Sequence, residues 1–201
     1  RYNHHTDINR AINVWPDNPI GYGAEGMKYR FQWNFPLFFS THDDNKLYTC
    51  SQFLHVSYNG GQNWEIISPD LSRNDSTKLV SSGGPITKDN TGVEYYATIF
   101  AALESPFEKD LLWCGSDDGL IHVSKDGGKN WTNVTPKKLP EWAQINSIEA
   151  DPFHKGGLFV AATMYRMGDY TPYLYHTTDY GKSWKLITNG IPNEHFTRVI
   201  R

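Results

Sequence analysis

One eight-residue pattern occurs three times in this chain, and it constrains the fold more than any other feature of the sequence. The copies span residues 57–64, 124–131 and 177–184. Each has Ser or Thr first, Asp or Asn third, Gly fifth and Trp last. Repetition of this kind, with strand-like sequence between the copies, is typical of solenoids and propellers, in which each repeat is one small structural unit. The pattern therefore predicts a repeat protein rather than a catalytic α/β domain.

The residue types of the pattern predict a self-contained hairpin with a hydrophobic anchor. The acidic or amide side chain and the hydroxyl can bond to backbone groups of their own turn. The glycine suits a turn position that needs a positive φ. The tryptophan is placed to pack between neighbouring sheets and to bury a large apolar area. The residues assigned to this structural role are Ser57, Asn59, Gly61, Trp64, Ser124, Asp126, Gly128, Trp131, Thr177, Asp179, Gly181 and Trp184.

Composition agrees with an all-β protein and excludes some functions. The chain is rich in aromatic residues, at 14%, and has 17 Gly and 11 Pro but no long segment with a helical apolar period, so we expect many short strands. The net charge of -3, without a Lys/Arg-rich stripe, gives no indication of nucleic-acid binding. No apolar run is long enough to span a membrane. No signal peptide is recognised at Arg1, and the absence of an initial Met suggests a processed chain or a fragment.

Around each copy of the pattern the sequence predicts four short strands. The predicted strands are 31–35, 46–50, 54–57 and 64–67 for the first unit, 96–103, 111–115, 120–123 and 131–134 for the second, and 145–150, 157–163, 173–177 and 184–187 for the third. Four antiparallel strands per repeat, packed radially through aromatic anchors, are the architecture of a β-propeller. We therefore predict an all-β partial β-propeller with blades at about 31–68, 96–135 and 145–188.

Three blades are too few to close a propeller, which has at least four. Residues 195–201 read as the start of a further blade, so we expect the chain to be part of a larger ring. Residues 1–30, which include a predicted turn at Pro16-Asp17-Asn18-Pro19, have little strand character and are interpreted as a lead-in segment or the end of a preceding blade. Exposed sheet edges favour aggregation, so we expect more of the same chain or a partner to cover them.

The three copies of the pattern resemble Asp-boxes, or BNR repeats, which are found in sialidases, other glycoside hydrolases and the sortilin-type propeller. Segments 47–75, 81–106, 113–142 and 173–192 more particularly resemble large bacterial secreted proteins with sortilin-like propellers, often labelled glycosyl hydrolase. The similarity covers roughly residues 27–201. The first copy departs from the Asp-box pattern because Asn59 replaces the usual Asp. The resemblance is specific for fold and weak for function, since the motif occurs in enzymes and in binding proteins.

Alternation of strand direction predicts where binding residues lie. The repeated turns share one face with the turns between first and second strands, so long loops gather on the opposite face, where binding residues tend to lie. That face would hold residues 68–94, 116–118, 137–142 and 164–172, with Arg166, Tyr170 and Trp142 as candidate binding residues.

Glycosidase chemistry needs two carboxyl groups, one on either side of the glycosidic bond. The candidates are Asp117, Asp118, Asp169 and Glu94. The seven arginines do not match the arginine cluster of sialidases. We favour a polar β-turn for Asp117-Asp118-Gly119 and a strand start with aromatic packing for Glu94-Tyr95-Tyr96.

No cofactor and no metal site are expected. His42 lies beside Asp43 and Asp44 but lacks the spacing of a zinc site. Calcium at the 70–75 cluster, through Asp70, Asn74 and Asp75, is an alternative to a solvated polar loop, which we favour. Cys50 and Cys114 are assigned to equivalent second-strand positions of adjacent blades and are expected to be buried free thiols.

Two functions of different classes follow. The first is an extracellular or periplasmic propeller that acts as a binding scaffold for a protein, peptide or glycan. The alternative is a glycoside hydrolase to which this segment contributes some of the carboxylates. A purely structural part of a cell-surface or filament assembly is a weaker interpretation. We favour binding, because no complete catalytic set is recognised and fold analogy carries little information on activity.

Overall fold

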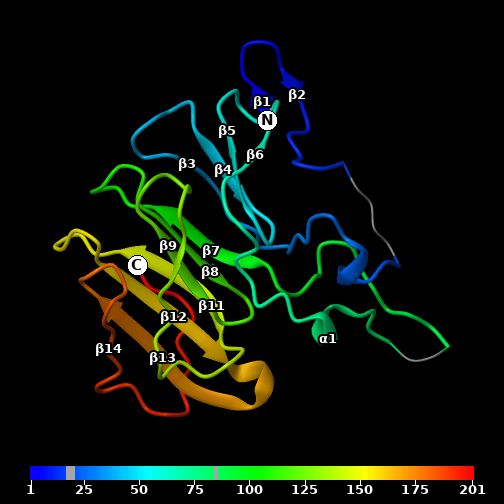
Figure 1. The fold of residues 1–201 in the computed structure, drawn as a ribbon. Helices are drawn as coiled ribbons and strands as arrows, with labels where there is room; N and C mark the ends of the chain where they lie inside the picture. The colour runs from blue at the N-terminus through cyan, green and yellow to red at the C-terminus, as the bar shows by residue number, and fades with distance from the viewer. Residues whose placement is uncertain (17–20, 84–85) are drawn as a thin grey trace.

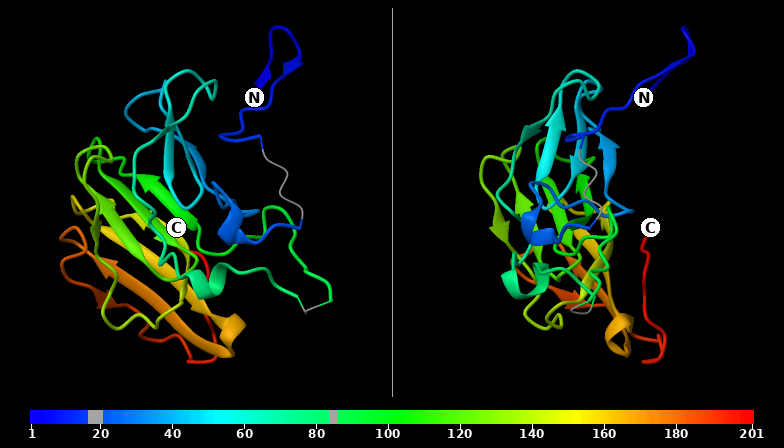
Figure 2. Two further views of the ribbon diagram at one scale, coloured as in Figure 1. Left: turned by 45° about the vertical axis from the view of Figure 1, so that its right-hand side comes forward. Right: turned by 90° about the vertical axis from the view of Figure 1, so that its right-hand side faces the viewer.

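The structure is a computed structural model that describes residues 1–16, 21–83 and 86–201. The described residues form three four-stranded antiparallel sheets and one two-stranded hairpin. Figure 1 shows the three sheets fanned side by side in chain order, and Figure 2 shows the same arrangement from two further sides. The fold is therefore an all-β partial propeller with four-stranded antiparallel blades. Residues 17–19 of the turn predicted at Pro16–Pro19 lie outside the described residues.

Each blade is a simple meander in which strand order follows the sequence. The first contains β3 (Leu37–Phe39), β4 (Leu47–Cys50), β5 (Leu54–Ser57) and β6 (Glu65–Ile66). The second contains β7 (Ile99–Glu104), β8 (Leu112–Ser116), β9 (Ile121–Ser124) and β10 (Thr132–Asn133). The third contains β11 (Gln144–Ala150), β12 (Leu158–Met164), β13 (Asp169–Thr177) and β14 (Lys185–Leu186). The remaining elements are β1 (Tyr2–Asn3), β2 (Ile8–Asn9), η1 (Ala24–Gly26), α1 (Ser76–Leu79) and η2 (Tyr165–Met167).

One predicted strand is in the wrong place. Residues 31–35 alternate in polarity but form a turn, in which the Phe35 N–H donates to the Gln32 carbonyl at 3.1 Å. The strand β3 begins after Pro36, which has no N–H to donate to a sheet. The Pro36 carbonyl accepts the Thr49 hydroxyl at 3.0 Å, which fastens this bend to β4. Because residues 32–35 form a turn, the first strand of this blade begins at Leu37 and not at residue 31.

Apolar side chains fill the layers between blades. The first layer holds Tyr48, Leu54 and Val56 of the first blade against Ile99 and Leu112 of the second. The second layer joins the second and third blades through a larger buried cluster, whose members include Leu111, Trp113, Ile121, Ile145, Leu158 and Val160. Burial of this surface stabilises the fold by about 25 cal/mol per Å² of apolar area. The blades are thus held to one another by core packing rather than by shared strands.

Each repeated turn is closed by its own side chains. In the second copy the Ser124 hydroxyl accepts the Gly128 N–H at 2.9 Å and donates to Asp126 at 2.9 Å. Asp126 in turn accepts the Asn130 N–H at 2.9 Å. The third copy repeats this arrangement, and in the first copy the amide oxygen of Asn59 accepts two backbone N–H groups at 3.0 Å. The exchange of Asp for Asn therefore leaves the turn intact.

The same turns join each blade to the chain before it. The indole N–H of Trp131 donates to the Ile67 carbonyl at 2.8 Å, and that of Trp184 donates to the Val134 carbonyl at 2.7 Å. The indole N–H of Trp64 donates to the Ile12 carbonyl at 2.9 Å. Ile67 and Val134 follow the fourth strands of the first and second blades, so Ile12 occupies the corresponding place before the first blade. We therefore interpret part of the lead-in segment as the end of a preceding blade.

The chain after β14 forms no strand among its described residues. It crosses the third blade toward β11, where the backbone N–H of Ile200 donates to the Ser147 hydroxyl at 3.4 Å. The connection from β10 to β11 likewise carries the chain from the fourth strand of one blade to the first strand of the next (Figure 1). The start of a further blade at 195–201 stays a prediction. No helix in the described parts of the chain has both the length and the apolar character needed to cross a membrane.

The two cysteines are free and buried, but their predicted equivalence is wrong by one residue. Cys50 pairs with Leu54, whereas Cys114 pairs with His122, so the position equivalent to Cys50 is Gly115. Neighbouring residues of a strand point to opposite faces of its sheet. Cys50 therefore faces the second blade, Cys114 faces the first, and both lie in the layer between these blades.

Candidate functional site

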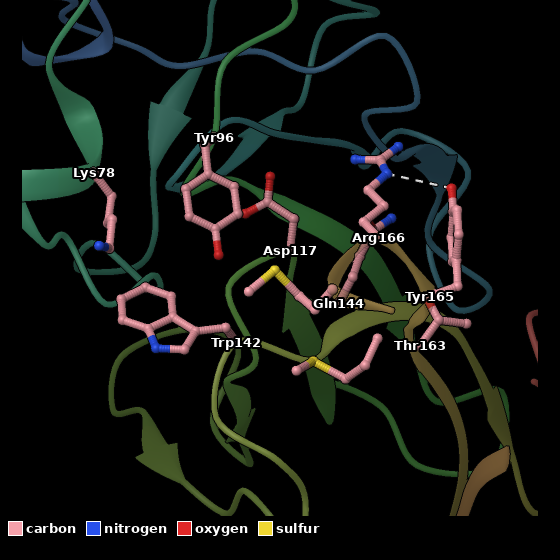
Figure 3. Close-up of a pocket in the computed structure, with 10 residues that line it drawn as sticks. Lys78, Tyr96, Asp117, Trp142, Gln144, Thr163, Tyr165 and Arg166 are labelled. Atoms are coloured by element: carbon pink, nitrogen blue, oxygen red, sulfur yellow. Dashed lines mark hydrogen bonds between the residues drawn. The ribbon is translucent and has the colours of Figure 1, made fainter. Parts of the chain in front are cut away.

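A cavity of about 380 Å³ lies between the second and third blades. It is on the face away from the repeated turns, where the β8–β9 and β12–β13 connections and the connections between blades gather. Figure 3 shows the side chains that line it. They are Lys78, Tyr96, Asp117, Trp142, Gln144, Thr163, Met164, Tyr165, Arg166 and Met167. Three sequence candidates, Asp117, Trp142 and Arg166, thus line one cavity.

Different connections position the three candidates. Asp117 lies in the tight turn between β8 and β9, where the Gly119 N–H donates to the Ser116 carbonyl at 3.4 Å. Trp142 lies directly before β11 with a φ of 68°, in the left-handed region. Arg166 lies in the short η2 after β12. The polar turn expected at 116–119 is present and also supplies a wall of the cavity.

Asp117 is buried, and its pKa is raised. Its carboxylate accepts the Thr98 N–H and the Thr98 hydroxyl, both at 2.8 Å. Burial raises the pKa of Asp117 to about 7, and nearby Asp118 raises it too, although the bonds from Thr98 act in the opposite direction. Asp117 is therefore partly protonated at neutral pH. A carboxyl group in this state can donate as well as accept a hydrogen bond.

An aromatic platform forms one end of the cavity. The rings of Trp142 and Tyr96 are stacked with centroids 6.3 Å apart and planes inclined by 29°. The Arg73 guanidinium lies 4.8 Å and the Lys78 ammonium 5.9 Å from the Trp142 ring, within the range of cation–π attraction. In Figure 3 the Trp142 ring lies below Lys78, and the Tyr96 ring lies beside the Asp117 carboxylate. Burial, with help from the two aspartates, raises the pKa of Tyr96, so its hydroxyl stays protonated.

Arg166 supplies a cation at the opposite end of the cavity. Its Nε donates to the Tyr165 hydroxyl at 3.2 Å, as the dashed line in Figure 3 marks. Arg166 is exposed and makes no ion pair with any residue of the described chain. Its guanidinium is therefore free to bind an acceptor in the cavity.

Asp118 does not line the cavity, and its bonds hold neighbouring segments of the fold together. Its carboxylate accepts the Ser116 hydroxyl at 2.6 Å and the Arg73 N–H at 2.8 Å, and its carbonyl accepts Arg73 Nε at 2.7 Å. Arg73 also pairs with Glu141 at 2.9 Å. Asp118 thus anchors the segment that follows the first blade, and a direct role in binding is not supported.

The remaining candidates are dispersed. Glu94 accepts the indole N–H of Trp33 at 3.0 Å, away from the cavity. Asp169 accepts the Tyr173 hydroxyl at 2.6 Å, which together with bonds from Thr171 lowers its pKa. Tyr170 lies near Phe196, with ring centroids 6.2 Å apart. The four carboxyl candidates therefore do not converge, and only Asp117 among them lines the cavity.

The 70–75 cluster is built around an arginine instead of calcium. The guanidinium of the buried Arg30 donates to Asp70 at 2.7 Å, to Ser72 at 3.0 Å and to Asn74 at 3.4 Å. Its Nε donates to the Ala97 carbonyl at 2.9 Å. Asp75 caps α1 through the Thr77 N–H. The guanidinium occupies the space beside Asp70 and Asn74 that a calcium ion would need, so the calcium alternative is not supported.

Sequence reasoning missed one group that can hold a metal ion. Asp151, His154 and His176 bring three donor atoms within 4.8 Å of one another. His176 follows Asp151 by 25 residues, beyond β12, η2 and most of β13, so no short spacing reveals the group. The sequence also missed the cavity residues Gln144 and Thr163, which are buried strand residues whose partners are set by the packing of blades.

The comparisons with known proteins agree with the propeller fold. No protein-family model matches the chain. An 85-residue segment is 35% identical to a probable oligoxyloglucan-reducing end-specific xyloglucanase of Neosartorya fischeri and 31% identical to the corresponding enzyme of Emericella nidulans. Each match covers 41% of this chain and 10% of the relative, so the match spans about a tenth of the length of these enzymes.

Among solved structures, an ancestral GH74 enzyme superimposes with a TM-score of 0.50 at 16% identity, over 78% of this chain and 18% of the enzyme. At this identity the likeness concerns the fold alone. An 85-residue segment of the chain is thus similar to a part of two xyloglucanases, and the fold of the chain is that of a propeller.

Proposed function

We propose that this segment of a β-propeller binds carbohydrate in the cavity between its second and third blades. The observation that carries the proposal is the combination of an aromatic platform, Trp142 on Tyr96, with a free cation at Arg166 and a single carboxyl group at Asp117. Aromatic faces pack against the apolar faces of sugar rings, and a few placed polar groups fix the orientation of a ligand. The partial match to xyloglucanases favours an oligosaccharide over a peptide.

Binding is favoured over cleavage because of the carboxyl groups. Hydrolysis of a glycosidic bond needs two carboxyl groups at about 5–10 Å from each other. Within the described residues the cavity is lined by one, and its oxygens are already bonded to Thr98. This arrangement suits a site that holds a sugar chain without cutting it.

Binding is tested by titrating the purified protein with xyloglucan oligosaccharides in a calorimeter. We expect Trp142→Ala to weaken binding by about five- to tenfold, because a stacking energy of about 1–1.4 kcal/mol is lost with the ring. Trp33→Ala is the matched control, since Trp33 is an exposed tryptophan outside the cavity. Equal losses in both variants, or no binding of any oligosaccharide by the unaltered protein, would contradict the proposal.

A hydrolase is the second candidate function, and the raised pKa of Asp117 favours it. A carboxyl group with a pKa of about 7 can act as a general acid at neutral pH. The second carboxyl group would then come from a part of the protein outside this segment. Reducing sugar release by the full-length protein, abolished by Asp117→Asn and unaffected by Glu94→Gln, is the result expected of this alternative.

We also propose the finer features of the resemblance: Asp-box turns, a sortilin-like propeller, an extracellular or periplasmic location, and blades at 31–68, 96–135 and 145–188. Further blades or a partner would cover the outer faces of this segment. Support comes from the three self-bonded turns and from the contact of Trp64 with the lead-in segment. Fractionation of cells that produce the protein, followed by detection with an antibody, tests the location.

A further inference from the structure

The turn between β11 and β12 carries a buried carboxylate whose two oxygens have different tasks. Asp151 is 1% exposed. Its Oδ1 accepts the Phe153 N–H at 2.8 Å and so closes the turn. Its Oδ2 lies 2.8 Å from His154 Nδ1 and 2.7 Å from His176 Nε2. One oxygen therefore closes the turn, and the other lies within hydrogen-bond distance of two imidazole nitrogens.

The other two blades show that the turn does not require this second oxygen. The equivalent turns begin at Ser40 and Ser105, as the backbone bonds from Ser40 to Lys46 and from Ser105 to Leu111 indicate. Each serine hydroxyl accepts the N–H two residues later, as Asp151 Oδ1 does. A serine thus suffices to close the turn. The carboxylate of the third blade adds a donor atom that the fold has no need of.

His176 is also an addition of the third blade. It directly precedes the repeated turn, at the place of Val56 and Val123 in the first two blades. Valine fills this strand position in those blades, so an imidazole is not demanded by the packing. The ring of Phe159 is stacked on His176 with centroids 4.2 Å apart and planes inclined by 10°, which fixes the direction of the ring. Two polar residues that the repeat does not need therefore meet at one point.

We propose that Asp151, His154 and His176 bind a divalent transition metal ion such as zinc. Imidazole nitrogens and a carboxylate oxygen are common ligands of this ion, at about 2.0–2.2 Å. Two such ligands at the tetrahedral angle are about 3.4 Å apart, so the present hydrogen-bonded separations of 2.7–2.8 Å must widen by about 0.6 Å when the ion enters. The His154 side chain is 54% exposed and can make that movement, and solvent can supply a fourth ligand.

The position of the group separates it from the cavity. The group lies at the end of the third blade that carries the repeated turn, since the Tyr180 N–H of that turn donates to the Gly156 carbonyl at 2.9 Å. It is thus on the face opposite the cavity, and its function is separable from carbohydrate binding.

Metal binding is tested with the purified, metal-free protein and zinc alone, by calorimetry and by the rise in Tm that a bound ligand causes. Cobalt is a second probe, because its visible absorption reports the geometry of its ligands. We expect one ion per chain, and at least tenfold weaker binding in His154→Ala and His176→Ala. His154→Ala is the more informative variant, since its half-exposed side chain can be removed without loss of the fold.

The control is a double variant, His4→Ala with His5→Ala, which removes the adjacent exposed pair near the start of the chain. Its zinc affinity should equal that of the unaltered protein. Loss of binding in this variant, retention of full affinity in His154→Ala, or absence of binding by the unaltered protein at millimolar zinc would each overturn the proposal.

Discussion

Replacement of Gly128 by alanine tests whether the repeated turns hold the blades together. Gly128 has a φ of +96°, which L side chains rarely adopt. An added Cβ would lie 2.6 Å from the Ile67 carbonyl oxygen and 3.0 Å from the Ile67 Cβ. The same carbonyl accepts the indole N–H of Trp131. The substitution therefore strains the turn and also pushes the first and second blades apart.

The two costs can be separated. A non-glycine residue in the left-handed region costs about 1–2 kcal/mol. Overpacking against atoms that cannot move freely costs about 1–3 kcal/mol more. Gly190 has a φ of +87° but no atom within 4 Å of an added Cβ, so Gly190→Ala carries only the first cost. We expect the free energy of unfolding to fall by about 2–5 kcal/mol in Gly128→Ala and by about 1–2 kcal/mol in Gly190→Ala.

Urea unfolding, followed by tryptophan fluorescence, measures both values. The difference between the variants is the cost of overpacking the added Cβ against Ile67 of the preceding blade. If Gly128→Ala and Gly190→Ala lose the same stability, the turn does not press on the preceding blade and the argument fails. A lower m-value in Gly128→Ala alone would instead show that the blades no longer unfold as one unit.

Three further predictions follow from buried or bonded groups. Arg30→Met should lower the free energy of unfolding by about 3–5 kcal/mol, because it leaves Asp70 and the Ala97 carbonyl without their buried partner, and urea unfolding would show whether the loss is smaller. The side chain and backbone of Asn130 lower the pKa of Asp126 from 3.8 to about 2, so the stability that Asp126 contributes is present above pH 4 and lost as the pH falls from about 4 to 2. Asp126→Asn should flatten this loss in acid unfolding curves, and parallel curves for the two proteins would count against the assignment. Burial raises the pKa of both Cys50 and Cys114, so a thiol reagent should label them only after denaturant is added, and fast labelling of the native protein would refute this.

The fold could be predicted because its requirements are local and recur along the chain. Each repeated turn needs a hydroxyl, an acceptor and a glycine within eight residues, and these are visible in the sequence. The strand ends that border the turns were placed to within about one residue, because the turns mark these points, whereas β13 begins four residues before its predicted start. The strand predicted at 31–35 was wrong because its alternation was judged without the proline that follows it. The cysteine register was wrong because no turn fixes a position within a strand.

The candidate site was predicted only in part, because it depends on which loops of two blades face each other. Asp117, Trp142 and Arg166 could be assigned to one face from strand direction alone. Two features depend on packing that the sequence does not display. They are the convergence of these residues on one cavity and the bonds from Arg73 that hold Asp118 outside it. The ion pair from Arg30 to Asp70 joins residues that are 40 apart, and it decided the nature of the 70–75 cluster.

Differences between equivalent positions of the three blades separate what the fold needs from what it does not. The repeated hydroxyls and glycines recur because every blade needs them, and a change such as Asn59 keeps the same bonds. Asp151 and His176 stand where the other blades have serine and valine, so packing and turn closure do not account for their chemistry. Burial alone disfavours the charged form of the Asp151 carboxylate, and the bonds from Phe153, His154 and His176 offset that cost. The repeat thus provides its own control, and it identifies Asp151 and His176 as residues that are particular to the third blade.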